Sequence, residues 1–233
     1  MLRRITAIAA AALLVACFGG RDRIAAAGQV IASDAFNRAD GTTLGSTPQG
    51  QAWTLDGRST WGVQSGRARV LTGPSNGPAM TWIRAGATDH VTIAADITLS
   101  PTYRRANAGL VYRLADRRNN LWSKLEVSPG HPNGLMTIGK TSDGAVTSLL
   151  AKRDNIGLRN GATYHLSVDV DGTSIAATVS GDALPAPVTI RYSLTSAESA
   201  RYSANDGYGL RVKLASDEDD GGSRWDAFSV TAR

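Results

Sequence analysis

The tetrapeptides Ser33-Asp34-Ala35-Phe36 and Trp225-Asp226-Ala227-Phe228 stand near opposite ends of the chain and share the pattern Asp-Ala-Phe. Between them the sequence is a series of short runs in which apolar and polar residues alternate, with hardly one amphipathic helical pattern. A first and a last strand of matching pattern, with a dozen strands between them, predict a β-sandwich whose two terminal strands lie side by side.

The clearest alternation is found at 90–99 and 163–170, and Asp171-Gly172 then predicts a hairpin to a strand at 175–179. Each run has one apolar face, so each sheet must cover one side with a partner sheet. A short helical stretch is expected only at 196–200. Further strands are expected at 67–71, 79–84, 108–114, 121–127, 135–141, 146–151, 188–193, 210–214 and 228–230.

Tight turns are expected at many places, because Asn and Asp before Gly tolerate the positive φ that hairpin turns require. Eight such pairs in about 200 residues favour an all-β, two-sheet antiparallel β-sandwich. They are Asp40-Gly41, Asp56-Gly57, Asn76-Gly77, Asn133-Gly134, Asp143-Gly144, Asn160-Gly161, Asp171-Gly172 and Asp206-Gly207.

Residues 1–30 are expected to be a signal peptide, and residues 31–233 a single domain. Arg3 and Arg4 precede an uncharged apolar stretch at 5–16 that is too short to span a bilayer. The stretch ends in Leu14-Val15-Ala16-Cys17, which resembles a bacterial lipoprotein box and predicts lipidation of Cys17. The alternatives are cleavage after Ala25-Ala26-Ala27, with free secretion, or an uncleaved leader. We expect an exported protein, either secreted or anchored in the cell envelope.

The charge of the domain argues against nucleic acid as a partner. The whole chain carries a formal net charge of +5. Removal of Arg3 and Arg4 with the leader leaves +3, and cleavage after Ala27 leaves +2. The acidic run at 217–220 is expected to be a solvated loop, and no block of five or six like charges occurs. Contact with a membrane is expected only through a lipid anchor.

Eight motifs follow one another along the chain. They are Asp34-Ala35-Phe36-Asn37-Arg38-Ala39-Asp40, Leu44-Gly45-Ser46-Thr47, Gly50-Gln51-Ala52-Trp53, Trp61-Gly62-Val63, Gly109-Leu110-Val111-Tyr112-Arg113, Asn119-Asn120-Leu121-Trp122, Gly207-Tyr208-Gly209-Leu210 and Trp225-Asp226-Ala227-Phe228. Their order resembles concanavalin A-like, laminin-G-like jelly-roll domains of bacterial and phage proteins. The resemblance spans roughly 31–231 and implies two curved, packed antiparallel sheets with a concave face often used for glycans.

The sequence offers little for catalysis. Jelly-roll glucanases carry paired carboxylates on one strand, as acid and as nucleophile or base, whereas no second acid follows Glu126 at i+2 or i+4. The histidines are dispersed, and neither a G-x-S-x-G nor an H-E-x-x-H motif occurs. We therefore expect a non-catalytic domain, although carboxylates from separate strands could still converge.

The resemblance implies a structural calcium ion where the first and last strands meet. Asp226 occupies the corresponding position of the last strand, and Asp34 lies in the paired first strand. Calcium takes six to eight oxygen ligands, mostly from carboxylates and carbonyls. The alternative is that Asp34 and Asp226 cap turns or pair with Arg38 or Arg224.

A ligand face is expected opposite the core. With Leu125 and Val127 inward, the alternation directs Trp122, Lys124 and Glu126 outward. Arg113 and Arg211 are expected on the same face. An exposed Trp122 would stack on a sugar ring, and its truncation would leave stability nearly unchanged. The alternative is a solvated face with cross-strand ion pairs.

These observations favour an exported, non-catalytic binding module for glycans or a cell-surface polymer. Two alternatives remain: a glycoside hydrolase or lyase of the jelly-roll glucanase type, and a structural or adhesion domain without a small-ligand site.

Overall fold

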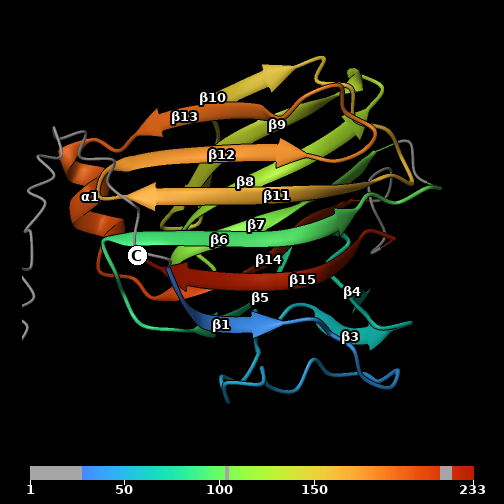
Figure 1. The fold of residues 1–233 in the computed structure, drawn as a ribbon, viewed down its shortest axis with the longest axis horizontal. Coiled ribbons are helices and arrows are strands. Elements are labelled where there is room, and N and C mark those ends of the chain that lie inside the picture. Colours follow the sequence, from blue (N-terminus) through green and yellow to red (C-terminus); the bar gives the residue numbers. More distant parts are fainter. Residues whose placement is uncertain (1–27, 103–104, 216–221) are drawn as a thin grey trace, which may run out of the picture.

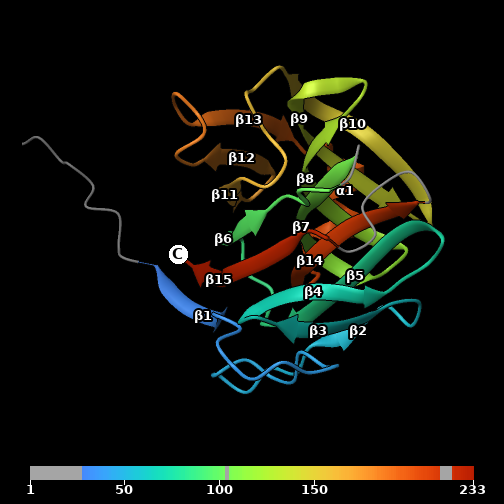
Figure 2. The ribbon, with the colours of Figure 1, turned by 90° about the vertical axis from the view of Figure 1, so that its right-hand side faces the viewer.

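The protein is a sandwich of two antiparallel β-sheets, as the sequence predicts. A computed structural model describes residues 28–102, 105–215 and 222–233. Seen from the side, the two sheets form two layers (Figure 2).

An eight-stranded sheet faces the viewer in Figure 1 and a seven-stranded sheet lies behind it. The first has the order β13 (Val188–Ser193), β12 (Ser174–Ser180), β11 (Thr163–Asp171), β6 (His90–Thr98), β15 (Arg224–Ala232), β4 (Arg67–Thr72) and β3 (Thr60–Gln64), with β1 (Gln29–Asp34) paired to β15. The second has the order β10 (Ala145–Asp154), β9 (His131–Ser142), β8 (Asn119–Ser128), β7 (Ala106–Asp116), β14 (Gly207–Ala215), β5 (Asn76–Arg84) and β2 (Thr54–Leu55).

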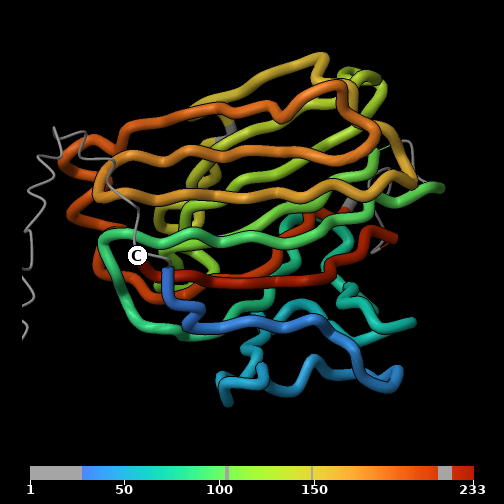
Figure 3. The backbone as a smooth tube through the Cα atoms, viewed as in Figure 1, coloured from blue at the N-terminus to red at the C-terminus, as the bar shows by residue number. Residues whose placement is uncertain are grey.

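The first and last strands are neighbours, which confirms the prediction from the matching ends. In the antiparallel β1–β15 pair, Gln29 lies opposite Ala232 and Asp34 opposite Phe228. Figure 3 shows the blue first strand running beside the red last strand. Strand β15 therefore lies inside its sheet, between β6 on one edge and β1 and β4 on the other.

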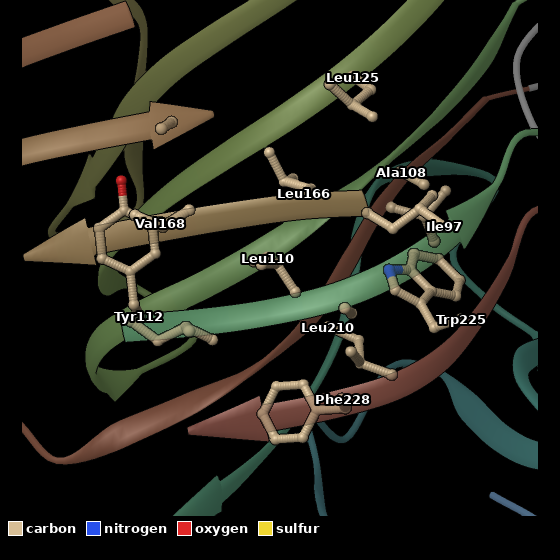
Figure 4. Close-up of a cluster of buried hydrophobic side chains, with 14 of the residues drawn as sticks. Ile97, Ala108, Leu110, Tyr112, Leu125, Leu166, Val168, Leu210, Trp225 and Phe228 are labelled. Carbon is tan, nitrogen blue, oxygen red and sulfur yellow. The ribbon is translucent and has the colours of Figure 1, made fainter. Parts of the chain in front are cut away.

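The core fills the space between the sheets. Side chains of β6, β11 and β15 face those of β7, β8 and β14 (Figure 4). The rings of Trp61 and Trp225, both fully buried, have centroids 5.2 Å apart. Other labelled core residues are Ile97, Leu166, Val168 and Phe228 from the eight-stranded sheet, and Ala108, Leu110, Tyr112, Leu125 and Leu210 from the seven-stranded sheet.

Several of the predicted turns occur, and others do not: Gly41 pairs with Val63 and Gly207 begins β14. Asp143 and Gly144 join β9 to β10 with φ of 52° and 88°, the conformation of a type I′ hairpin turn. Asn76-Gly77 and Asn133-Gly134 instead lie within β5 and β9. Their glycines keep positive φ, so they interrupt the regular strand geometry without reversing the chain.

The one short helix predicted from the sequence is α1 (Ser196–Tyr202). Thr195 and Glu198 form a capping box at its start. Burial would raise the pKa of Glu198, but the ion pair with Lys140 and hydrogen bonds from Thr195 and Tyr192 lower it to about 2. The helix is thereby fixed to β9 of the seven-stranded sheet.

Candidate functional site

One side of β8 faces away from the core. Leu125 and Val127 belong to the core, so the residues between and beside them lie on the opposite side of the seven-stranded sheet. Trp122 lies opposite Val111 of β7 and Gly139 of β9. We call this surface the outer face; it comprises Asn107, Gly109, Val111, Asn120, Trp122, Lys124, Glu126, Thr137, Gly139, Lys152, Asp154, Gly209 and Arg211.

Trp122 is buried, although the sequence led us to expect an exposed ring. Its exposed fraction is 1%. The guanidinium carbon of Arg211 lies 4.3 Å from the centroid of the indole, a cation–π contact. The ring also fills the space beside Gly139, where an added Cβ would lie 2.2 Å from it. The expectation of an exposed stacking platform is therefore wrong, because residues of β14 and β9 enclose the ring.

Arg113 is buried as well, and it does not share the outer face. Its φ is 48°, and the pairing of β7 with both neighbouring strands shifts there. This bulge interrupts the alternation after Tyr112. The guanidinium donates to the carbonyls of Ser203 and Asp89, the latter just before β6 of the other sheet. The expectation that Arg113 faces away from the core with Trp122 is wrong, because a single strand's alternation does not reveal a bulge.

Lys124 and Glu126 lie on the outer face and form an ion pair, with 14% and 19% of their side chains exposed. Burial raises the pKa of Glu126, but the charge and the hydrogen bond of Lys124 outweigh burial, and the net shift is downward. The carboxyl group is therefore ionised at neutral pH. It is suited to accepting hydrogen bonds and not to donating a proton.

The polar surface continues onto β9 and β10. Thr137 lies opposite both Lys124 and Lys152. The carboxylate of Asp154 lies 3.6 Å from Nζ of Lys152 and 2.5 Å from Nδ1 of His131. The sequence alone did not indicate these residues as ligand candidates. The alternation of polar and apolar residues at 131–154 is visible in the sequence. Only the register of β8, β9 and β10, however, brings these polar residues beside Lys124.

Three buried polar atoms on the outer face have no hydrogen-bond partner in the described part of the chain. They are Nε1 of Trp122, Oδ1 of Asn120 and Oγ1 of Thr137. Their residues are at most 1% exposed. A buried polar group without a partner costs about 1–3 kcal/mol, so most such groups in proteins are paired. Their gathering on neighbouring strands indicates a surface whose hydrogen bonds are completed by a bound molecule or by water.

Asp34, one of the two expected calcium ligands, is buried in the N-terminal part of the sandwich and 2% exposed. Its Oδ1 accepts hydrogen bonds from the Phe36 amide at 2.8 Å and from Arg38 at 3.1 Å. Its Oδ2 accepts from Arg38 and from Nε1 of Trp53, both at 2.8 Å. Both carboxylate oxygens are thus already satisfied by donors.

Asp226, the second expected ligand, faces the opposite side of the sheet. Its side chain is 41% exposed, accepts a hydrogen bond from the Ala227 amide and lies 4.0 Å from Arg67. Ala227 has φ of 47° and marks a bulge, so two residues, where regular alternation has one, separate the core residues Trp225 and Phe228. The bulge and the β1–β15 register keep Asp34 on the inner side and Asp226 on the outer side. The structure does not bring these two residues together.

Solved structures that share this architecture include three with TM-scores of 0.58 to 0.60. The carbohydrate-binding module CBM66 from Bacillus subtilis matches with a TM-score of 0.58 and 18% identity, over 77% of this chain and 95% of the module. The exoplasmic domain of VIP36 in its Ca²⁺-bound form matches with a TM-score of 0.60 and 10% identity, over 87% of this chain and 90% of that domain. A xylan β-1,4-xylosidase from Bacillus halodurans matches with a TM-score of 0.58 and 11% identity, over 94% of this chain but 41% of the enzyme.

This chain has the concanavalin A-like jelly-roll fold. No protein-family model matches its sequence, and none of the curated protein sequences matches it. With sequence identities of 10–18%, these structures establish a shared fold. What this chain binds depends on its own side chains.

The VIP36 domain was solved with bound calcium. In this protein, Asp34 is not suited to binding a calcium ion. A cation would have to displace Arg38 and two N–H donors from a carboxylate that is buried with them. Within 28–102, 105–215 and 222–233, no group of three or more His, Cys, Asp or Glu is arranged to hold a metal ion.

Residues 1–27 of the expected leader at 1–30 lie outside the described residues, whereas Gln29 and Val30 begin strand β1. Cys17 and its predicted lipidation belong to residues 1–27. In the part that the structure describes, no helix is long and apolar enough to cross a membrane.

Proposed function

We propose that this protein is a glycan-binding module whose ligand lies on the outer face, over the Trp122–Arg211 contact. The observation that carries the proposal is the set of buried, unpartnered polar atoms of Asn120, Trp122 and Thr137. Small-molecule sites combine an apolar surface with a few fixed polar groups. These atoms are buried, so the side chains around them must move before a ligand can reach them. Sugar hydroxyls both donate and accept, so they then match the donor of Trp122 and the acceptor of Asn120.

Charged groups beside these atoms support the same proposal. Arg211 is 3% exposed and is oriented by its contact with the indole, so little side-chain freedom is lost when it donates to a ligand. The ionised Glu126 supplies acceptors. Among the structures of the same fold, CBM66 is a carbohydrate-binding module, and VIP36 was solved with bound mannose.

The Arg211→Met variant tests this site. Methionine keeps an apolar chain over the indole but removes the guanidinium, so we expect glycan affinity to fall about ten- to hundredfold. A glycan array identifies a ligand, and titration calorimetry compares the two proteins. Arg191→Met, at an exposed position of β13 on the other sheet, is the matched control and should bind as the wild type does.

Equal binding by Arg211→Met and the wild type would contradict the proposed site. Absence of binding to any glycan would favour a structural or adhesion role.

The hydrolase alternative predicts that the protein releases reducing sugars from polysaccharides and that Glu126→Gln abolishes this release. The lowered pKa of Glu126 argues against its use as a general acid.

We also propose that the chain is exported and acylated at Cys17. Acyl chains supply the energy of membrane anchoring. Cys17→Ala should therefore move the protein from the membrane fraction to the soluble fraction of fractionated cells, as detected by immunoblot. An unchanged membrane fraction would contradict acylation at this residue.

A further inference from the structure

A line of polar groups runs along β8 on the outer face. Rows of residues cross this strand there, two residues apart along it, and the strand register gives their members. The rows are Asn120 and Thr141; Trp122 and Gly139; Lys124, Thr137 and Lys152; and Glu126, Leu135 and Asp154. From Asn120 to Glu126 the strand extends about 20 Å at the usual rise per residue. A line of this length can contact several units of a sugar chain.

Cations and carboxylates alternate at the Glu126 end of this line. Lys124 forms an ion pair with Glu126, and Nζ of Lys152 lies 3.6 Å from Asp154, which also contacts His131. Each of these cations therefore has a carboxylate beside it. An acidic ligand would have to compete with these carboxylates. The hydroxyl groups of a neutral sugar, in contrast, can donate to the carboxylates and accept from the cations.

The line is open at the Glu126 end and closed at the Asn120 end. The side chains of Asp154 and Glu126 are 34% and 19% exposed, whereas Trp122 and Asn120 are buried. Arg211 covers the indole of Trp122. A ligand therefore reaches the Glu126 end directly, and it reaches the Trp122 end when Arg211 and its neighbours move.

Thr137 lies between the two ends, opposite both Lys124 and Lys152. Its side chain is buried, and its Oγ1 has no hydrogen-bond partner in the described part of the chain. A ligand that extends from the Glu126 end to the Trp122 end passes this hydroxyl and can complete its hydrogen bonding. The bonding of Thr137 therefore depends on the length of the ligand.

We infer that the ligand is a neutral, linear glycan chain that lies along β8, with its first units at Glu126 and Asp154 and later units at Thr137 and Trp122. The inference rests on the proposed function, because it takes the outer face as the glycan site. It adds the charge, the direction and the length of the ligand. A chain that spans the line can bond all the buried atoms that have no partner in the described residues, whereas a short ligand at the open end leaves them unpaired.

The first test varies the length and charge of the ligand. Linear oligosaccharides of xylose, mannose and glucose, with two and with six units, are titrated by calorimetry and, where binding is weak, by NMR. We expect at least one six-unit chain to bind about tenfold or more tighter than its two-unit form. This factor exceeds what the additional binding positions on a longer chain provide. The affinity should be the same at low and physiological salt, because the ligand is uncharged. The six-unit oligogalacturonate, an acidic chain, should bind much more weakly.

The second test is the Thr137→Val variant, which removes the hydroxyl and keeps the shape of the side chain. We expect affinity for the six-unit chain to fall about tenfold, toward that of the two-unit form. The melting temperature should not fall, because a buried polar group without a partner costs stability. Thr178→Val, on β12 of the other sheet, is the matched control and should bind as the wild type does.

Failure of every neutral chain to bind, equal affinity for the two lengths, or unchanged six-unit binding by Thr137→Val would each overturn the inference. So would a fall in the melting temperature of Thr137→Val, because the hydroxyl would then be bonded within the protein. If the glycan array finds only charged or single-unit ligands, and Arg211→Met weakens their binding, the proposed function stands and this inference fails. Absence of binding to any glycan overturns both.

Discussion

Replacement of Asp34 by alanine should lower the free energy of unfolding by about 3–5 kcal/mol. The carboxylate is 2% exposed and joins Arg38, the Phe36 amide and the Trp53 indole. Without it, two buried N–H donors and a partly buried guanidinium lose their acceptor. Phe36 also loses the bond that fixes its unfavourable positive φ of 51°. Chemical denaturation followed by tryptophan fluorescence measures the loss.

Asp226→Ala is the matched control for this prediction. Its distance of 4.0 Å from Arg67 and the 41–46% exposure of the two side chains describe a surface ion pair, which is worth at most about 1 kcal/mol. The effect of Asp34→Ala should be the same with chelator and with added calcium. A calcium-dependent melting temperature that disappears in Asp34→Ala would show that the carboxylate binds metal and would contradict its role as an internal acceptor.

Trp122→Ala should cost about 3 kcal/mol or more of stability, in contrast to the near-zero effect expected for an exposed platform. The indole is 1% exposed, is covered by Arg211 and fills the space beside Gly139. Truncation leaves a cavity and removes the support of the Arg211 guanidinium. Glycan affinity should fall with it, because Arg211 is no longer held in place. Thermal and chemical denaturation, together with glycan titration, measure both effects.

Trp122→Phe separates packing from hydrogen bonding. It keeps an aromatic ring under Arg211 and removes the Nε1 donor, which has no partner in the described structure. Stability should fall by about 1–3 kcal/mol, less than in Trp122→Ala, because the part of the ring that fills the space beside Gly139 is lost. A glycan that accepts a bond from the Nε1 donor should bind more weakly. Unchanged stability in Trp122→Ala would contradict the burial of the ring.

Most strands were predictable because each carries its own alternation. The runs at 67–71, 90–99 and 163–170 correspond closely to β4, β6 and β11. Short β2 and β3 were not predicted, since two to five residues carry too little periodicity. Asn133-Gly134 was misread as a turn because a positive φ can also occur inside a strand, and the dipeptide alone does not distinguish the two.

The candidate site was less predictable than the fold. Alternation within β8 identified the face on which Trp122 and Glu126 lie, because that property depends on one strand. Their exposure depends on neighbours: Arg211 covers Trp122 only because β14 lies beside β7, with Gly109 opposite Arg211. Single-strand patterns contain no information about such pairings.

The central place of β15 also determines when this domain can fold during synthesis. Without the last strand, the eight-stranded sheet consists of β13, β12, β11 and β6 on one side and β4 and β3 on the other, with β1 unpaired. N-terminal segments of many proteins fold while the rest is being made. Here the segment Arg224–Ala232 joins the separate parts, and contacts so distant in sequence form slowly. The sandwich can therefore be completed only after β15 has left the ribosome, and a chain cut short before β15 has no route to the native sheet.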